Sequence, residues 1–248
     1  MELIIKQMNK PTQKVDWFSY AQTYDMLMTY NPYYQQLHAD LTTLIRDWKV
    51  EQGDTLLDLG AGTGNYSVEL AKGHPEANVL HVELNRGMSA VAQHKKEQLE
   101  LNNLQILNKD VEKLALDASS VKGCICIHSL YTFPHPQQVL ANIFNWTSPG
   151  GYGIFVDPGR IVNVLSWQLA IGWQLIKNYG VPKTIELLKK GKEISHQNRQ
   201  IRKAQRDGTY WTHSHQAFLS AIQNAGFQIL ESQYCFRGLS DMVIAQKQ

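Results

Sequence analysis

Near residue 60 a short apolar run leads straight into three closely spaced glycines. Residues 55–59 read Thr-Leu-Leu-Asp-Leu, and glycine follows at positions 60, 62 and 64. Glycine has no Cβ atom and tolerates positive φ angles, so the pattern predicts a strand that enters a tight turn whose backbone approaches a ligand closely. Several folds that bind nucleotides place such a turn between a strand and a helix, so the glycines alone do not identify the ligand.

Strand-length apolar runs alternate with helical patterns from residue 54 onward. This alternation is typical of βαβ units, which build a parallel sheet. The last two strands are separated only by a turn at Arg237 and Gly238, with no room for a crossover helix, so we expect them to be antiparallel. The expected helices cover residues 67–72, 87–102, 136–146 and 215–225. The seven expected strands cover residues 55–59, 78–83, 104–108, 123–128, 152–156, 227–231 and 241–245.

Two segments lie outside this alternation. The first is rich in aromatic side chains, and we expect residues 1–50 to form an N-terminal helical lid. The second, residues 159–212, separates the fifth strand from the last helix, and we expect it to form a helical cap. The α/β core then consists of residues 51–158 and 213–248.

Composition and charge are those of an ordinary globular protein. Hydrophobic residues make up 43% of the chain and charged residues 19%. The formal net charge of +2 is too small to indicate the strongly basic face that follows a phosphate backbone. We therefore expect no nucleic-acid partner.

Cysteine usage and the apolar stretches bear on compartment and cofactors. Cys124, Cys126 and Cys235 are an odd number with no disulfide framework, and no Cys or His spacing completes a zinc site, so we expect reduced thiols and no metal. Residues 1–6 lack the apolar core of a secretory signal, which predicts a cytoplasmic protein. Residues 161–176 are interrupted by polar side chains and short for a membrane span, so we expect a buried or surface-lying helix there.

Acidic residues stand at or just beyond the ends of the first three strands. They are Asp58, Glu83 and Asp110. The carboxyl ends of parallel strands meet at the edge where ligands bind in this architecture, so the three carboxyl groups should converge there. Asp58 would repel a dinucleotide pyrophosphate and attract a cationic amino group. Glu83 is placed to accept hydrogen bonds from ribose hydroxyls, and Asp110 from an adenine amine.

These motifs together resemble those of the class I S-adenosylmethionine-dependent methyltransferases. The similarity lies in Leu-Leu-Asp-Leu-Gly-Ala-Gly-Thr-Gly at residues 56–64, in Glu83 and Asp110, and in Ser-Pro-Gly-Gly at residues 148–151. The resemblance implies an α/β, Rossmann-like seven-stranded sheet, mostly parallel with the last strand antiparallel and with helices on both faces. It also implies an enzyme that uses S-adenosylmethionine, releases S-adenosylhomocysteine and transfers the methyl group by direct in-line attack.

Within that family the chain is most similar to small-molecule enzymes related to quinone-biosynthesis methyltransferases. The shared features are Tyr24-Asp25 in an N-terminal helix and His-Ser-Leu-Tyr at residues 128–131. In that subgroup the loop after the fourth strand lies beside the reactive methyl group, so His128 and Tyr131 are the catalytic candidates. A histidine can act as a general base near neutral pH, although it can equally serve only as a hydrogen-bonding group in the cofactor pocket. The resemblance and the strand-end positions give the following cofactor-binding candidates: Phe18, Tyr24, Asp58, Gly60, Ala61, Gly62, Gly64, Glu83, Leu84, Asp110, Val111 and His128.

The acceptor and the partners are left open between several hypotheses. The leading one is methylation of an O, N or C atom of a small-molecule metabolite by a monomer or homodimer. A second is a lipid-like, membrane-associated acceptor, because residues 161–176 carry Trp167 and Trp173 and residues 177–206 hold nine Lys or Arg against two Glu. A third is a non-catalytic protein that binds S-adenosylmethionine. Asp58 and the glycine spacing disfavour an NAD-dependent oxidoreductase.

Overall fold

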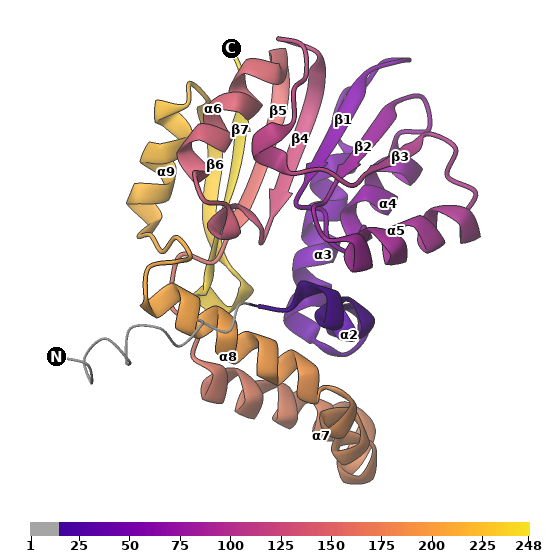
Figure 1. The fold of residues 1–248 in the computed structure, drawn as a ribbon, viewed down its shortest axis with the longest axis vertical. Helices are drawn as coiled ribbons and strands as arrows, with labels where there is room; N and C mark the ends of the chain where they lie inside the picture. The colour runs from indigo at the N-terminus through magenta and orange to yellow at the C-terminus, as the bar shows by residue number, and fades with distance from the viewer. Residues whose placement is uncertain (1–14) are drawn as a thin grey trace, which may run out of the picture.

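One seven-stranded sheet organises the chain (Figure 1). We describe residues 15–248 of a computed structural model; the segment 1–6, for which no secretory signal was expected, lies outside these residues. The strand order is β3-β2-β1-β4-β5-β7-β6, which places β1 and β4 side by side at the centre. The strands are β1 Thr55–Leu59, β2 Asn78–Val82, β3 Leu104–Leu107, β4 Val121–Ile127, β5 Thr147–Asp157, β6 Gln228–Cys235 and β7 Ser240–Gln246.

Strand directions confirm the predicted fold class. The pairs along β3-β2-β1-β4-β5 are parallel, whereas β7 is antiparallel to both β5 and β6. The short turn Phe236–Gly238 joins β6 to β7, which is why these two strands form a hairpin. Strand β5 begins at Thr147, five residues earlier than expected. Pro149, Gly150 and Gly151 do not precede the strand but lie within it, where its pairing with β4 shifts register.

Helices cover both faces of the sheet. On one face the apolar sides of α6 and α9 pack on the strands, with Leu140 and Phe218 fully buried. On the other face α3 and α4 pack through Leu41, Ile45 and Leu70. The helices are α2 Trp17–Tyr30, α3 Pro32–Arg46, α4 Asn65–Gly73, α5 Arg86–Gln98, α6 Pro136–Trp146, α7 Val164–Lys190, α8 Lys192–Arg206 and α9 His215–Asn224.

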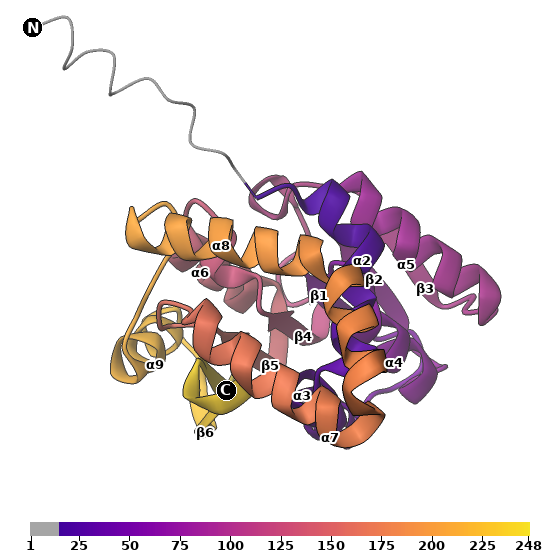
Figure 2. The same cartoon turned by 90° about the horizontal axis from the view of Figure 1, so that it is seen from below.

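Three helices gather beyond one end of the sheet. Figures 1 and 2 show α7 and α8 side by side, with α2 next to them. The backbone N–H of Asp16, which caps α2, donates to the Gln197 side chain on α8. Of the first fifty residues, α2 therefore joins the cap helices, whereas α3 packs on the sheet.

Helix α7 contains the expected apolar segment from Val164 onward, three residues later than expected, and continues to Lys190. It bends at Gly180, which has a φ of 74°, because Pro182 has no N–H for the helical hydrogen-bond ladder. Among the helices of residues 15–248, none has the length and apolar character needed to cross a membrane.

Candidate functional site

The glycine loop forms the floor of a cleft at the carboxyl ends of β1 and β2. Gly60 and Gly64 adopt φ values of 63° and 78°, which favour glycine. A Cβ atom on Gly60 would lie 2.4 Å from the Cβ of Ser129, so the loop packs tightly against the segment after β4. A Cβ on Gly62 would meet nothing within 4 Å, so this part of the loop faces open space where a ligand fits.

Asp58 lies beneath the loop rather than on the cleft wall. Its carboxylate accepts a 2.5 Å hydrogen bond from the Ser67 hydroxyl, whose oxygen is also 2.9 Å from His81 Nδ1. All three side chains are buried. Burial raises the pKa of Asp58 to about 7 and lowers the pKa of His81 to about 4, so both groups favour their neutral forms. The chain Asp58–Ser67–His81 ties β1, α4 and β2 together under the site.

Glu83 and Asp110 line the cleft as expected from their positions after β2 and β3. Glu83 accepts hydrogen bonds from the backbone N–H groups of Gly62 and Asn85, at 3.0 and 2.7 Å. Burial raises the pKa of Glu83, and these N–H groups partly oppose that rise. Asp110 accepts from the Glu112 N–H at 3.0 Å. Both carboxyl groups keep lone pairs that ligand hydroxyl or amine groups can use.

The cleft has a volume of about 570 Å³, within the usual range for cofactor and small-molecule sites. Ten of the residues expected to bind the cofactor line it, and Gly64 and Asp58 lie behind its surface. Phe18 sits at the mouth, where its ring would contact a Cβ added to Gly87, and it is 58% exposed. The ten are Phe18, Tyr24, Gly60, Ala61, Gly62, Glu83, Leu84, Asp110, Val111 and His128.

Helix α2 closes one side of the cleft and is held there by Asp25. One carboxylate oxygen accepts from Thr63 Oγ1 at 2.7 Å and from Asn65 Nδ2 at 3.1 Å. The other oxygen is 2.7 Å from Lys95 Nζ on α5. These contacts connect α2 directly to the glycine loop, so the helix and the loop cannot separate without breaking them.

A second cavity of about 180 Å³ lies between α2, α7, α8 and the end of β4. Its walls are mostly aromatic and aliphatic, with a few uncharged polar groups such as Asn198 and Gln205. Four side chains line both this cavity and the cofactor cleft. They are Trp17, Tyr24, Tyr34 and His128.

His128 occupies this junction in an unusual backbone conformation. Its φ of 52° is rare for a residue other than glycine, and two hydrogen bonds hold it there. Its N–H donates to the Val156 carbonyl at 2.7 Å, and its Nε2 is 2.9 Å from the Ser240 hydroxyl. Burial lowers the pKa of His128 to about 4, so the imidazole is neutral at physiological pH.

Tyr131 reaches the second cavity from the turn after β4. Its ring meets that of Tyr210 edge-on at 5.2 Å between centroids. Burial raises the pKa of Tyr131 well above its ordinary value, so the phenol keeps its proton and can donate a hydrogen bond. Its backbone N–H donates to Asp157 at 3.1 Å.

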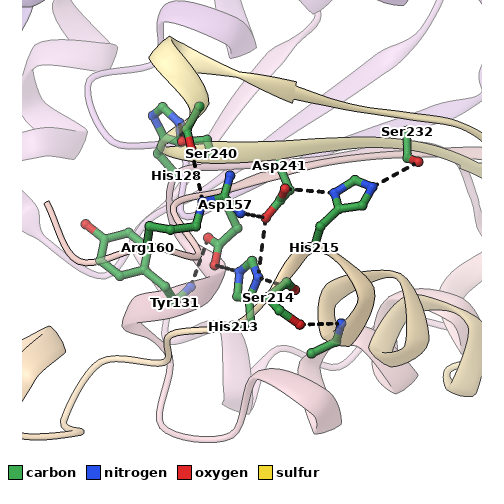
Figure 3. Close-up of polar contacts among 12 residues, drawn as sticks. His128, Tyr131, Asp157, Arg160, His213, Ser214, His215, Ser232, Ser240 and Asp241 are labelled. Atoms are coloured by element: carbon green, nitrogen blue, oxygen red, sulfur yellow. Dashed lines mark hydrogen bonds and ion pairs between the residues drawn. The ribbon is translucent and has the colours of Figure 1, made fainter.

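A buried polar network contacts the turn after β4 through Asp157, which accepts from the Tyr131 N–H (Figure 3). His213 lies between Asp157 and Asp241, with its Nε2 3.3 Å from the first and its Nδ1 3.5 Å from the second. Asp241 also contacts Arg160 and His215, the latter at 2.8 Å. Because Arg160 and His213 flank the cap in sequence, the network fastens both ends of the cap to β5 and β7.

Ser129 belongs to the His-Ser-Leu-Tyr segment that the sequence singled out, whereas Trp17, Tyr34 and Phe236 of the two cavities were not among the sequence candidates. Ser129 donates to the Leu59 carbonyl at 2.9 Å and so joins the turn after β4 to the glycine loop. Tyr34 and Phe236 pack edge-on at 4.7 Å beside His128. Trp17 and Tyr34 belong to the aromatic N-terminal segment, so composition offered a signal for them. No local pattern marks Phe236.

Comparison with known proteins agrees with this geometry. Residues 57–155 match the family model described as a methyltransferase domain. A demethylmenaquinone methyltransferase of Oceanobacillus iheyensis is 26% identical over 112 residues, which cover 45% of this chain and 47% of that protein. A malonyl-[acyl-carrier protein] O-methyltransferase of Halalkalibacterium halodurans is 30% identical over 113 residues, covering 44% of this chain and 41% of that protein. The chain thus matches about half the length of these curated relatives, or less.

Solved structures extend the likeness to nearly the whole chain. A SAM-dependent methyltransferase from Aquifex aeolicus aligns with a TM-score of 0.60 at 14% identity, covering 93% of this chain and 98% of that one. Sheet order, glycine loop and domain match together define the class: a Rossmann-like, class I methyltransferase fold. The chain therefore has the fold of the S-adenosylmethionine-dependent methyltransferases, and its residues 57–155 are similar to their catalytic domain.

Proposed function

We propose that the protein transfers the methyl group of S-adenosylmethionine to an O, N or C atom of a small molecule by direct in-line attack. The observation that carries this proposal is the junction of the two cavities. A cofactor in the cleft and an acceptor in the second cavity would meet between Tyr24, Tyr34 and His128. The aromatic and aliphatic walls favour an acceptor with a largely apolar body and few hydrogen-bonding groups.

The residues present fit the cofactor. Glu83 would hold the ribose hydroxyls and Asp110 the adenine amine, while the open side of Gly62 admits the ligand close to the backbone. When bound, the cofactor supplies an electrophilic methyl group on a positively charged sulfur. Tyr24 and Tyr34 line the junction with their hydroxyl oxygens 3.3 Å apart, and aromatic rings stabilise a nearby cation. Asp58 acts beneath this surface, by positioning the loop.

In this proposal, the protein accelerates the reaction by aligning the two reactants and excluding water from between them. The neutral His128 is engaged with Ser240, and its lowered pKa makes it a weak base. We therefore assign it the role of shaping the junction, and Tyr131 that of a hydrogen-bond donor to the acceptor. Holding two reactants in line without water between them accounts for large rate enhancements without acid–base help.

Calorimetric titration with S-adenosylmethionine and S-adenosylhomocysteine tests the first half of the proposal. Glu83→Gln keeps the shape of the side chain but removes its charge, and hydrogen bonds to charged groups are worth about 1.5–3 kcal/mol. We expect micromolar binding by the wild-type protein and affinity weaker by about 10- to 100-fold in the variant. Glu76→Gln, on a partly exposed residue away from both cavities, should bind like the wild type. Absence of binding by the folded wild-type protein would contradict the proposal.

Formation of S-adenosylhomocysteine with a panel of apolar phenols, amines and enolisable carbonyl compounds tests the second half. A non-catalytic, cofactor-binding protein would bind S-adenosylmethionine and give no product with any member of the panel. The apolar second cavity also fits the lipid-like acceptor, so the panel should include compounds with long alkyl or isoprenoid tails. A preference for tailed over tailless acceptors would select that class.

A further inference from the structure

Helix α7 exposes large apolar side chains along most of its length. Leu169 and Trp173 are 67% and 68% exposed and lie one helical turn apart. Side chains spaced by three or four residues share one side of a helix, so the exposed residues form one strip before the bend at Gly180 and a shorter one after it. We call these residues together the outer face of α7: Leu165, Leu169, Trp173, Ile176, Val181 and Ile185.

The opposite side of the same helix is also apolar. Trp167, Ile171 and Leu175 line the second cavity, and Leu187 is buried beyond the bend. A helix that is apolar all round is stable in water only if both sides find apolar surroundings. The inner side lies against the cavity and α8. The outer face is exposed, so we expect a partner to cover it.

Basic residues border the outer face. Lys177 lies one turn beyond Trp173, and Lys189 one turn beyond Ile185; both are exposed. The single acidic residue of α7, Glu186, is paired with Lys183 at 2.9 Å and with Lys190 at 2.7 Å. The neighbouring α8 has five Lys or Arg and one Glu. Figure 2 looks onto the side of the molecule where α7 and α8 lie next to each other.

We propose that the outer face of α7 docks on an anionic lipid bilayer, with α7 lying in the interface. An apolar strip that contains tryptophan and is bordered by lysines has the chemistry of an interfacial amphipathic helix. Anionic headgroups attract each lysine near the surface. A second copy of the chain fits less well, because a two-fold contact through α7 brings the lysines of both copies together. Docking rests on this surface alone; its link to a bilayer-dissolved acceptor, which would enter the cavity beside α7, rests on the proposed function.

Vesicle flotation with the full-length protein tests the docking. Wild-type protein should float with vesicles of phosphatidylcholine and phosphatidylglycerol, less with phosphatidylcholine alone, and should detach at high salt. The double variant Leu169→Glu/Trp173→Glu alters only exposed positions and should lower the partition coefficient at least about tenfold. Leu230→Glu, at a 52% exposed apolar position on β6, is the matched control and should float like the wild type.

Three outcomes separate the possibilities. Failure of the wild-type protein to float, or equal flotation of the double variant, would overturn the docking. A wild-type dimer that dissociates in the double variant, without flotation of either, would show that α7 contacts a second copy and would also overturn it. Titration with S-adenosylmethionine reports on the proposed function separately, since both variants should bind the cofactor like the wild type whatever happens on vesicles.

Discussion

At the scale of single residues, Asp58 and His81 show how burial sets protonation beneath the glycine loop. The fold favours protonated Asp58, so this contribution to stability is present at low pH and is lost as the pH rises from 3.8 to about 7. The fold also favours neutral His81, whose contribution is present above pH 6.5 and is lost as the pH falls to about 4. Between these limits the folded and unfolded chains hold nearly the same number of protons on the pair, so the two dependences largely cancel.

Removing either group should reveal the dependence of the other. In Asp58→Asn, the part of the unfolding free energy contributed by this pair should rise with pH between about 4 and about 6.5, because only His81 still titrates. In His81→Asn, it should fall with pH between about 4 and about 7. Urea denaturation at a series of pH values measures both slopes relative to wild type. Parallel pH profiles in all three proteins would show that the two side chains are not neutral in the fold.

At the scale of elements, α2 packs on α5 and α8 rather than on the sheet, and polar contacts add to this packing. Its buried residues, such as Tyr20 and Leu27, pack in a small cluster separate from the two cores on the sheet faces. We therefore expect the Asp25 contacts with Thr63, Asn65 and Lys95 to help keep α2 over the cofactor cleft. Since Asp25 is about one-third exposed, solvent weakens these contacts.

Asp25→Ala should loosen α2 without unfolding the sheet. We expect cofactor affinity to fall about tenfold, which corresponds to about 1.4 kcal/mol, mainly through faster dissociation. Stopped-flow fluorescence of Trp17 during cofactor release provides the measurement. Asp40→Ala, which removes an exposed contact to Gln36 on α3, is the control. Unchanged dissociation in Asp25→Ala would mean that packing alone holds α2.

At the scale of the whole molecule, the Asp157–His213–Asp241 network joins the cap to the sheet. Asp157 and Asp241 are register partners on the neighbouring strands β5 and β7, and both are fully buried. Two buried carboxyl groups side by side are unfavourable unless cations or donors separate them. His213 and Arg160 meet that need, and both belong to the segments where the cap leaves and rejoins the core.

Asp241→Ala should therefore destabilise the protein and release the cap. Removing one partner of a buried ion pair costs about 3–5 kcal/mol, because the remaining groups lose their acceptor. Urea denaturation measures the loss, and faster tryptic cleavage within the basic residues 177–206 reports on the cap. Asp117→Ala, at an exposed loop position, should change neither. A destabilised core with a protected cap would show that the network does not fasten it.

Local sequence patterns predicted the sheet and the glycine loop at the floor of the cleft. The alternation of apolar runs, the glycines at 60, 62 and 64, and the strand-end acids Glu83 and Asp110 are local patterns, and local patterns need only the period of a strand or the conformational freedom of glycine. The antiparallel last strand followed from the short turn before it.

The contact between the second cavity and the cleft depends on how distant elements pack, which no local pattern encodes. The contact of His128 with Ser240 joins residues 112 positions apart, and Phe236 reaches the junction from the opposite end of the chain. Asp58 is a further example. Its position at a strand end could be predicted from the sequence, but its side chain binds Ser67 and does not line the cleft. Spacing along the chain specifies which face of an element a residue occupies, whereas its partners depend on how the elements pack.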